Sequence, residues 1–350
     1  MKSRNNKIDM MKGLLIILMV AAHTQFWAHN FIFTFHMTCF FMISGFLYNK
    51  KYVQSKNSLN QLFKARLKNL YIPYIISNII FLISNNLLYK FHLVSQFYSI
   101  NDTILYLFKI LVFSARMPIN DSTWFLQVMF YVTIIYYFIE YVFKNNKNSV
   151  ILTNTIYIIL LILGYYMNKI NFNTYELGTI FSMIFFFNLG RIIKEKSDKI
   201  KINNKILFAS STISLLFLLI LTKIMGSKVI RVMQNQYYNP LILILSSLAD
   251  FCLIYTISYF IDKKKIKKLS SILQFIGRKT IYILVLHIFS FKIVSLLIIG
   301  IYNLNIENLS VIPVLTYKNW WFAYTIAGVN IPLVFYKIKI EIEKRLGNHF

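Results

Sequence analysis

The sequence predicts an all-α membrane protein, a polytopic bundle of about ten transmembrane helices. Of its 350 residues, 57% are hydrophobic and only 14% are charged, which is too apolar for one or two soluble domains. Apolar stretches of roughly 20 residues, the length that crosses a bilayer, recur along the whole chain. Basic residues collect in alternate connections between these stretches. We therefore expect one membrane domain covering residues 1–350.

Ten windows are apolar enough to be interpreted as spans: 13–29, 30–48, 70–89, 123–143, 149–168, 177–193, 206–222, 239–261, 280–299 and 317–336. The first window follows basic residues, as a signal peptide does, but no small-residue cleavage site follows it. We expect it to remain as the first helix. The longest external connection is 90–122, whose apolar part predicts a surface helix or a re-entrant helix.

Topology explains the net charge of +26 better than nucleic-acid binding does. Alternate connections carry 29 of the 38 basic residues, whereas the other connections carry 8. The positive-inside rule then places both termini in the cytoplasm. The expected partner is the lipid bilayer, with no nucleic acid, and the basic face also suits anionic lipid or a phosphate-bearing cofactor.

The two cysteines, Cys39 and Cys252, lie in apolar stretches without a Cys or His at a metal-ligand spacing. Neither a disulfide nor a metal site is indicated. No P-loop, dinucleotide fingerprint or nucleophile elbow is present either. Candidate chemistry must therefore come from polar groups inside the spans.

Lys12 and His23 form the first such candidate. Eleven residues separate them, which is roughly 16 Å of helix, and eleven steps of 100° return to nearly the same face. The pattern predicts a cation at the cytoplasmic edge and an imidazole near mid-membrane. This suits a cofactor with its phosphates near Lys12 and its reactive end near His23.

Other ionisable residues inside spans are also candidates, since burying them in a membrane is costly. His36 and His287 are expected to approach His23 near the midplane. The alternative for each is a single structural hydrogen bond between helices. Asp250 and Lys292 suit a structural ion pair.

Two further features have ordinary structural explanations. Trp124 follows the polar run 120–123, which is typical of a capped helix with a tryptophan at the membrane interface. Arg66 and Lys68 are typical of a positive-inside anchor.

Short motifs nevertheless follow one another in order over nearly the whole chain. They are Ile8–Gly13 with Lys12, ten residues and His23; Phe35-His36-Met37; Phe40–Leu47; Arg66 with Pro73-Tyr74; Trp124-Phe125-Leu126; Asn188-Leu189-Gly190 with its basic follower; and Ile276–Thr280 leading to His287. In this order the chain resembles the acyltransferase-3 family of membrane acyltransferases, typified by bacterial O-acetyltransferases of surface polysaccharides.

The resemblance implies an O-acyltransferase of the bacterial cell (cytoplasmic) membrane. It would move an acyl group, most often acetyl, from acyl-CoA to a hydroxyl of a glycan, a lipid-linked glycan or another envelope molecule. No bound cofactor is implied, because acetyl-CoA or another acyl-CoA is a co-substrate. No particular protein partner is implied.

The resemblance also implies roles for individual residues. His23 would act as general base or form an acyl-imidazole, with Lys12 as a second catalytic residue. Donor binding falls to Lys12, Arg66 and Lys68. The residues that would bind the acceptor or orient the histidines are Asp9, His36, Ser44, Trp124 and His287. One departure is Asn69, which stands where the family often has a second arginine.

Two other classes of protein fit part of the pattern. A proton-coupled secondary transporter of a small solute or envelope precursor also needs ionisable groups at mid-membrane. However, neither an inverted repeat nor a pair of broken helices is evident. A catalytically silent membrane scaffold is the third class, and the intact Lys12 and His23 argue against it.

Overall fold

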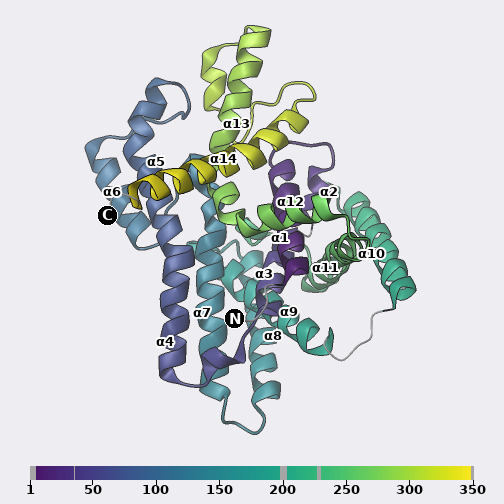
Figure 1. Cartoon of the computed structure of the whole chain (residues 1–350). Coiled ribbons are helices and arrows are strands. Elements are labelled where there is room, and N and C mark those ends of the chain that lie inside the picture. The colour runs from purple at the N-terminus through teal and green to yellow at the C-terminus, as the bar shows by residue number, and fades with distance from the viewer. Residues whose placement is uncertain (1–4, 35, 198–202, 227–229, 348–350) are drawn as a thin grey trace. The chain divides into compact units, whose positions relative to one another are not determined.

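The computed structural model describes residues 5–34, 36–197, 203–226 and 230–347. Its regular elements are helices, with one isolated β-bridge between Arg231 and Gln236 in these ranges (Figure 1). The predicted all-α fold class is confirmed.

The helices, in chain order, are α1 (Asn6–Ala22), α2 (His29–Phe33), α3 (His36–Phe46), α4 (Lys56–Arg66), α5 (Ile72–Lys90), α6 (Ile100–Leu111), α7 (Trp124–Phe143), α8 (Ser149–Lys169), α9 (Leu177–Ser197), α10 (Asn204–Met225), α11 (Pro240–Lys263), α12 (Lys267–Arg278), α13 (Thr280–Tyr302) and α14 (Trp321–Gly347). Short 3₁₀ turns join several of them, including η3 (Pro118–Thr123) and η6 (Ile306–Ser310), and the π-helical η2 (Leu67–Tyr71) makes α4 continuous with α5.

Within the described ranges, seven helical segments are long and apolar enough to cross a membrane: Lys56–Lys90, Pro118–Phe143, Ser149–Lys169, Thr174–Ser197, Asn204–Met225, Pro240–Lys263 and Thr280–Tyr302. Each contains or closely overlaps one predicted span, from 70–89 to 280–299. The protein is therefore a polytopic helix bundle. The count of ten spans and the cytoplasmic termini stay predictions.

The first predicted span, 13–29, is wrong in its boundaries. The helix begins seven residues earlier, because the Asn5 side chain caps it by accepting from the backbone N–H of Lys7 and Ile8. It ends at Ala22, since Gln25 adopts a left-handed backbone with φ 56°. His23 therefore caps the end of a helix instead of lying within one.

The second predicted span, 30–48, is two helices, α2 and α3, and not one. After α2, the Thr34 hydroxyl donates to the carbonyl oxygen of Phe31 at 2.7 Å, a side-chain bond that competes with helix continuation. Residue 35 lies outside the described residues. The last predicted span, 317–336, begins later, at Trp321, and α14 continues to Gly347.

The connection 90–122 contains α6, the helix expected in its apolar part. Ser99 and Asp102 form a reciprocal capping box at its start, and the hydrogen bonds from Ser99 lower the pKa of the Asp102 carboxyl. Ile104 and Phe108 remain 61% and 63% exposed on this helix. Such an apolar surface suits a helix lying against lipid.

The chain divides into two compact units, each built from separate segments. Unit 1 comprises Met1–His29, Tyr74–Thr123 and Lys268–Phe350, and it contains α1, most of α5, α6, α12, α13 and α14. Within it, α13 packs against both α14 and α1.

Two glycines let α1 and α12 meet backbone to backbone in unit 1. A methyl group on Gly277 would overlap the carbonyl oxygen of Asp9, and one on Gly13 would overlap that of Leu273. This crossing fixes α1, the helix that carries Lys12.

We expect Gly277→Ala to destabilise the protein by about 1–3 kcal/mol, because the added methyl group meets rigid backbone. The matched control is Gly300→Ala on α13, where a Cβ meets open space, so its effect should stay within about 0.5 kcal/mol. Thermal unfolding followed with a thiol-reactive dye measures both, since Cys39 is buried in the folded protein. Equal stability of the two variants would contradict the backbone contact.

Unit 2 comprises Asn30–Pro73 and Trp124–Lys267. Its central helix is α9, which packs against α3, α7 and α8, while α10 packs on α11. Glycines again allow the closest approach: a methyl group on Gly45 would overlap the carbonyl oxygen of Phe187, and one on Gly190 would overlap that of Met42.

Candidate functional site

Unit 1 brings together two of the predicted site residues, His23 and His287. Their ring centroids lie 5.3 Å apart with the ring planes at 43°. His287 is fully buried in α13, and His23 is partly buried at the end of α1. The backbone stays right-handed helical through His23, so the 11-residue spacing from Lys12 applies along one helix.

Hydrogen bonding defines the tautomer of His287. Its Nδ1 lies 3.0 Å from the carbonyl oxygen of Ile283 and 2.9 Å from that of Leu284. A carbonyl oxygen only accepts, so Nδ1 carries the proton and Nε2 presents a lone pair. This Nε2 is buried and has no hydrogen-bond partner among the described residues. His287 therefore offers an acceptor for a hydroxyl or an N–H group beside His23.

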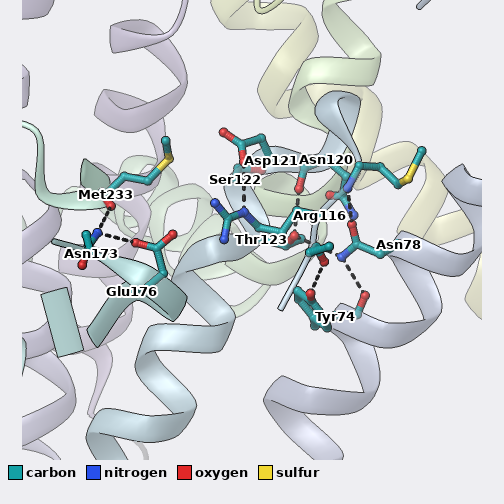
Figure 2. A network of polar contacts seen from close by, with 12 residues as sticks. Tyr74, Asn78, Arg116, Asn120, Asp121, Ser122, Thr123, Asn173, Glu176 and Met233 are labelled. Carbon is teal, nitrogen blue, oxygen red and sulfur yellow. Dashed lines mark hydrogen bonds and ion pairs between the residues drawn. The ribbon is translucent and has the colours of Figure 1, made fainter. Parts of the chain in front are cut away.

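A polar segment that precedes α7 contacts the same turn of α13. The Ser122 hydroxyl donates to the carbonyl oxygen of Leu284 at 2.6 Å, the carbonyl that His287 also uses. Asn78 on α5 holds the segment, since its Oδ1 accepts from the backbone N–H of Met117 at 2.9 Å. Figure 2 shows how Asn78 and its neighbours are arranged. The position of His287 thus depends on α5 as well as α13.

The same segment carries a charged pair and a second acceptor. Arg116 donates to the Asp121 carboxylate at 2.9 Å, and this carboxylate interacts electrostatically with His23. Asn120 donates to the Ser77 hydroxyl at 3.0 Å, while its Oδ1 is buried without a partner in the described part of the chain. This segment therefore adds an ion pair and a buried amide acceptor to the polar groups beside the histidine pair.

The sequence does not indicate four members of this network, Asn78, Asn120, Asp121 and Ser122, because the run 120–123 predicts only a helix cap. One signal was available for Asn78. An amide inside the apolar window 70–89 needs hydrogen-bond partners within the protein, and that requirement marks it as a structural or functional residue.

The other residues predicted for this unit lie on α1. Asp9 is 3% exposed at the α1–α12 crossing, and Lys12 is partly buried one turn later. Lys292 does not need the carboxylate predicted for it, because its Nζ donates to the carbonyl oxygens of Leu309 and Val311 at 2.7 and 2.9 Å.

Unit 2 holds the remaining predicted site residues. His36 is buried at the start of α3 and donates from Nδ1 to the carbonyl oxygen of Ile32 at 2.9 Å. Ser44 is partly buried on the same helix. Trp124 is only 7% exposed at the start of α7. The approach of His36 to His23 stays a prediction.

Arg66 and Lys68 differ in their surroundings. Lys68 is exposed in η2, as a positive-inside anchor would be. Arg66 is partly buried, and its Nε has no hydrogen-bond partner among the described residues. A buried guanidinium N–H without an acceptor suits an anionic ligand such as a phosphate.

Unit 2 also contains an ion-pair network that the sequence does not predict, centred on the basic residue after Gly190. This residue, Arg191, lies 2.6 Å from Glu140 and 3.0 Å from Glu195, and it donates to the Tyr136 hydroxyl at 3.0 Å. An open pocket of about 320 Å³ lies beside it, with lysines 50, 144 and 194 in its walls. Unit 2 therefore has a basic pocket with a fixed ion pair in its wall.

Comparison with known proteins identifies the family. A family model described as an acyltransferase domain matches residues 5–337. The chain belongs to the acyltransferase-3 family. No curated protein and no solved structure matches it.

Membership in this family, together with the apolar helices, makes the protein a multi-pass membrane acyltransferase. The resemblance of the ordered motifs is thus confirmed. None of these findings supports the alternative of a secondary transporter.

Proposed function

We propose that this acyltransferase moves an acetyl group from acetyl-CoA to a hydroxyl of a cell-surface glycan or a lipid-linked glycan, with His23 as general base. The observation that carries the proposal is the pairing of His23 with the buried acceptor nitrogen of His287. The family match supplies the reaction class.

The chemistry needs little more than a positioned base. The acceptor hydroxyl attacks the thioester carbonyl carbon, the carbon–sulfur bond breaks and the new carbon–oxygen bond forms. His23 takes the proton of the hydroxyl, and the departing thiolate of CoA is then protonated. Asp121 would stabilise the imidazolium, and His287 would orient the hydroxyl or the His23 ring.

The donor would enter from the basic face of the bundle. Lys12 lies on the same helix as His23, and Arg66 has a buried N–H without an acceptor. Lys12, Arg66 and Lys68 would hold the phosphates of CoA. Asp9, His36, Ser44, Trp124 and His287 would bind the acceptor or orient the histidines. We treat both units as one catalytic domain of the bacterial cytoplasmic membrane, which the match over residues 5–337 supports.

Purified protein in lipid nanodiscs tests the function directly. We expect release of free CoA from acetyl-CoA carrying a radiolabelled acetyl group, and transfer of the label to an envelope glycan fraction. Folded protein that neither binds nor turns over acetyl-CoA would contradict the proposal. If the protein turns over only succinyl-CoA, the transferred group is succinyl instead of acetyl, and the proposed type of reaction still holds.

Lys12→Met should raise the KM for acetyl-CoA roughly 10–100-fold, the range expected for loss of one hydrogen bond to a charged group, and should change kcat less. Lys7→Met on the same helix removes the same charge, so it is the matched control, and its KM should stay near the wild-type value. Steady-state kinetics of CoA release measures both. Equal effects of the two variants on the KM would show that Lys12 does not bind the donor.

A further inference from the structure

A small pocket opens in unit 1 between the end of α1 and the segment that leads into α14. It encloses about 110 Å³. Most of its wall is aromatic or carries amides, including Gln25, Trp27, Tyr317, Asn319, Trp320 and Trp321. The distribution of basic residues predicts that both segments lie on the external face of the membrane.

A series of ring contacts connects this pocket with the histidine pair. Tyr324, in the pocket wall, meets Phe291 edge-on with 5.5 Å between centroids, and Phe291 meets His287 in the same way at 5.5 Å. His287 in turn lies 5.3 Å from His23. The lining residue Thr24 follows His23 directly in the chain. The pocket is therefore next to the proposed base.

The aromatic walls are held in place by other side chains. Tyr324 is 2% exposed, and its hydroxyl donates to the carbonyl oxygen of Leu315 at 3.1 Å. The ring of Trp321 lies 4.5 Å from that of Phe26, and the ring of Tyr317 lies 4.5 Å from that of Tyr302. These contacts orient the rings before any ligand binds.

The rim of the pocket is polar. Gln25, Thr316 and Asn319 are exposed, and their side chains make no hydrogen bond within the described ranges. Lys318 is the one charged lining residue, with its Nζ 4.4 Å from the centroid of Tyr302. The pocket thus combines flat apolar faces with uncharged hydrogen-bonding groups.

We infer that this pocket binds one pyranose ring of the acceptor. A pyranose has the complementary surface, because its C–H faces stack on aromatic rings while its hydroxyls exchange hydrogen bonds with amides. The volume of about 110 Å³ suits part of one sugar ring. That the bound sugar is the acceptor rests on the proposed function.

An aromatic belt at the membrane interface does not account for this arrangement. A belt requires aromatic residues at the interface, without requiring that they converge. Three of the four tryptophans of the chain line this one pocket, together with two tyrosines and four uncharged polar side chains. Convergence of this kind is typical of ligand sites.

Saturation-transfer NMR on nanodisc-bound protein tests the inference without requiring activity. The probes are methyl β-D-glucopyranoside, methyl N-acetyl-β-D-glucosaminide and methyl α-L-rhamnopyranoside, with sorbitol as an acyclic control. We expect saturable binding of at least one pyranoside and none of sorbitol. Trp320→Ala should weaken this binding roughly 3–10-fold through loss of ring stacking, whereas Trp320→Phe should retain most of it.

Tyr238→Ala is the matched control, because Tyr238 is an exposed aromatic residue on another external connection. It should leave pyranoside binding unchanged. Failure of all three pyranosides to bind folded protein, or equal weakening by Tyr238→Ala, would overturn the inference. Acetyl transfer without pyranoside binding would refute sugar binding by this pocket and leave the proposed function standing. Pyranoside binding without acetyl transfer would refute the proposed function and leave sugar binding by the pocket standing.

Discussion

Replacing His23 with alanine is expected to lower the rate of acetyl transfer roughly 10²–10⁴-fold, the contribution typical of a general base. The reason is that, among the described histidines of unit 1, only His23 combines contact with His287 and electrostatic interaction with Asp121. Stability should fall little, since His23 lies at a helix end and is only partly buried. Release of CoA and thermal unfolding measure the two effects separately.

Rescue by added imidazole distinguishes a catalytic role of His23 from a structural one. If His23 acts as a base, free imidazole should restore part of the activity of His23→Ala, because the vacated site lies beside the acceptor hydroxyl. His29→Ala is the matched variant, since the His29 ring hydrogen-bonds to the carbonyl oxygen of Phe26, three residues earlier in the chain. Its activity should stay near wild type. Full acyl transfer by His23→Ala would exclude His23 from the mechanism.

The largest effect on stability is expected from Arg191→Met in unit 2. Side chains of Arg191 and Glu140 are only 14% and 12% exposed, so removal of the cation leaves a largely buried carboxylate without its closest cationic partner. Breaking such a pair costs about 3–5 kcal/mol. The Tyr157 hydroxyl, which donates to Glu140 at 2.9 Å, cannot replace the lost charge. The dye assay on Cys39 follows the unfolding.

Two variants separate this ion pair from simple loss of arginine packing. Glu195→Gln removes the other carboxylate, which is 60% exposed, and should cost no more than about 1 kcal/mol. Adding Glu140→Gln to Arg191→Met should recover much of the lost stability, because the unpaired charge is then gone. If the double variant is as unstable as the single one, the energy resides in packing and not in the charge.

The positions of the long apolar helices could be predicted from the sequence, whereas the boundaries of the first helix could not. Span 280–299 could be predicted because length and hydropathy are local properties, and lipid demands them of each crossing helix separately. Its observed counterpart is α13. The boundaries of the first span could not be predicted in this way, since the capping of α1 by Asn5 and the left-handed Gln25 are details of single residues.

The sequence by itself determined the all-α membrane class, the ordered family motifs and the candidacy of His23 and His287. Only the tertiary structure decided that these two rings meet at 5.3 Å and that Nε2 of His287 is the free acceptor. The same holds for the links from Asn78 to Met117 and from Ser122 to the Leu284 carbonyl. The physical reason is that such contacts join residues up to 264 positions apart. No periodicity along the chain records which faces of two helices will pack together.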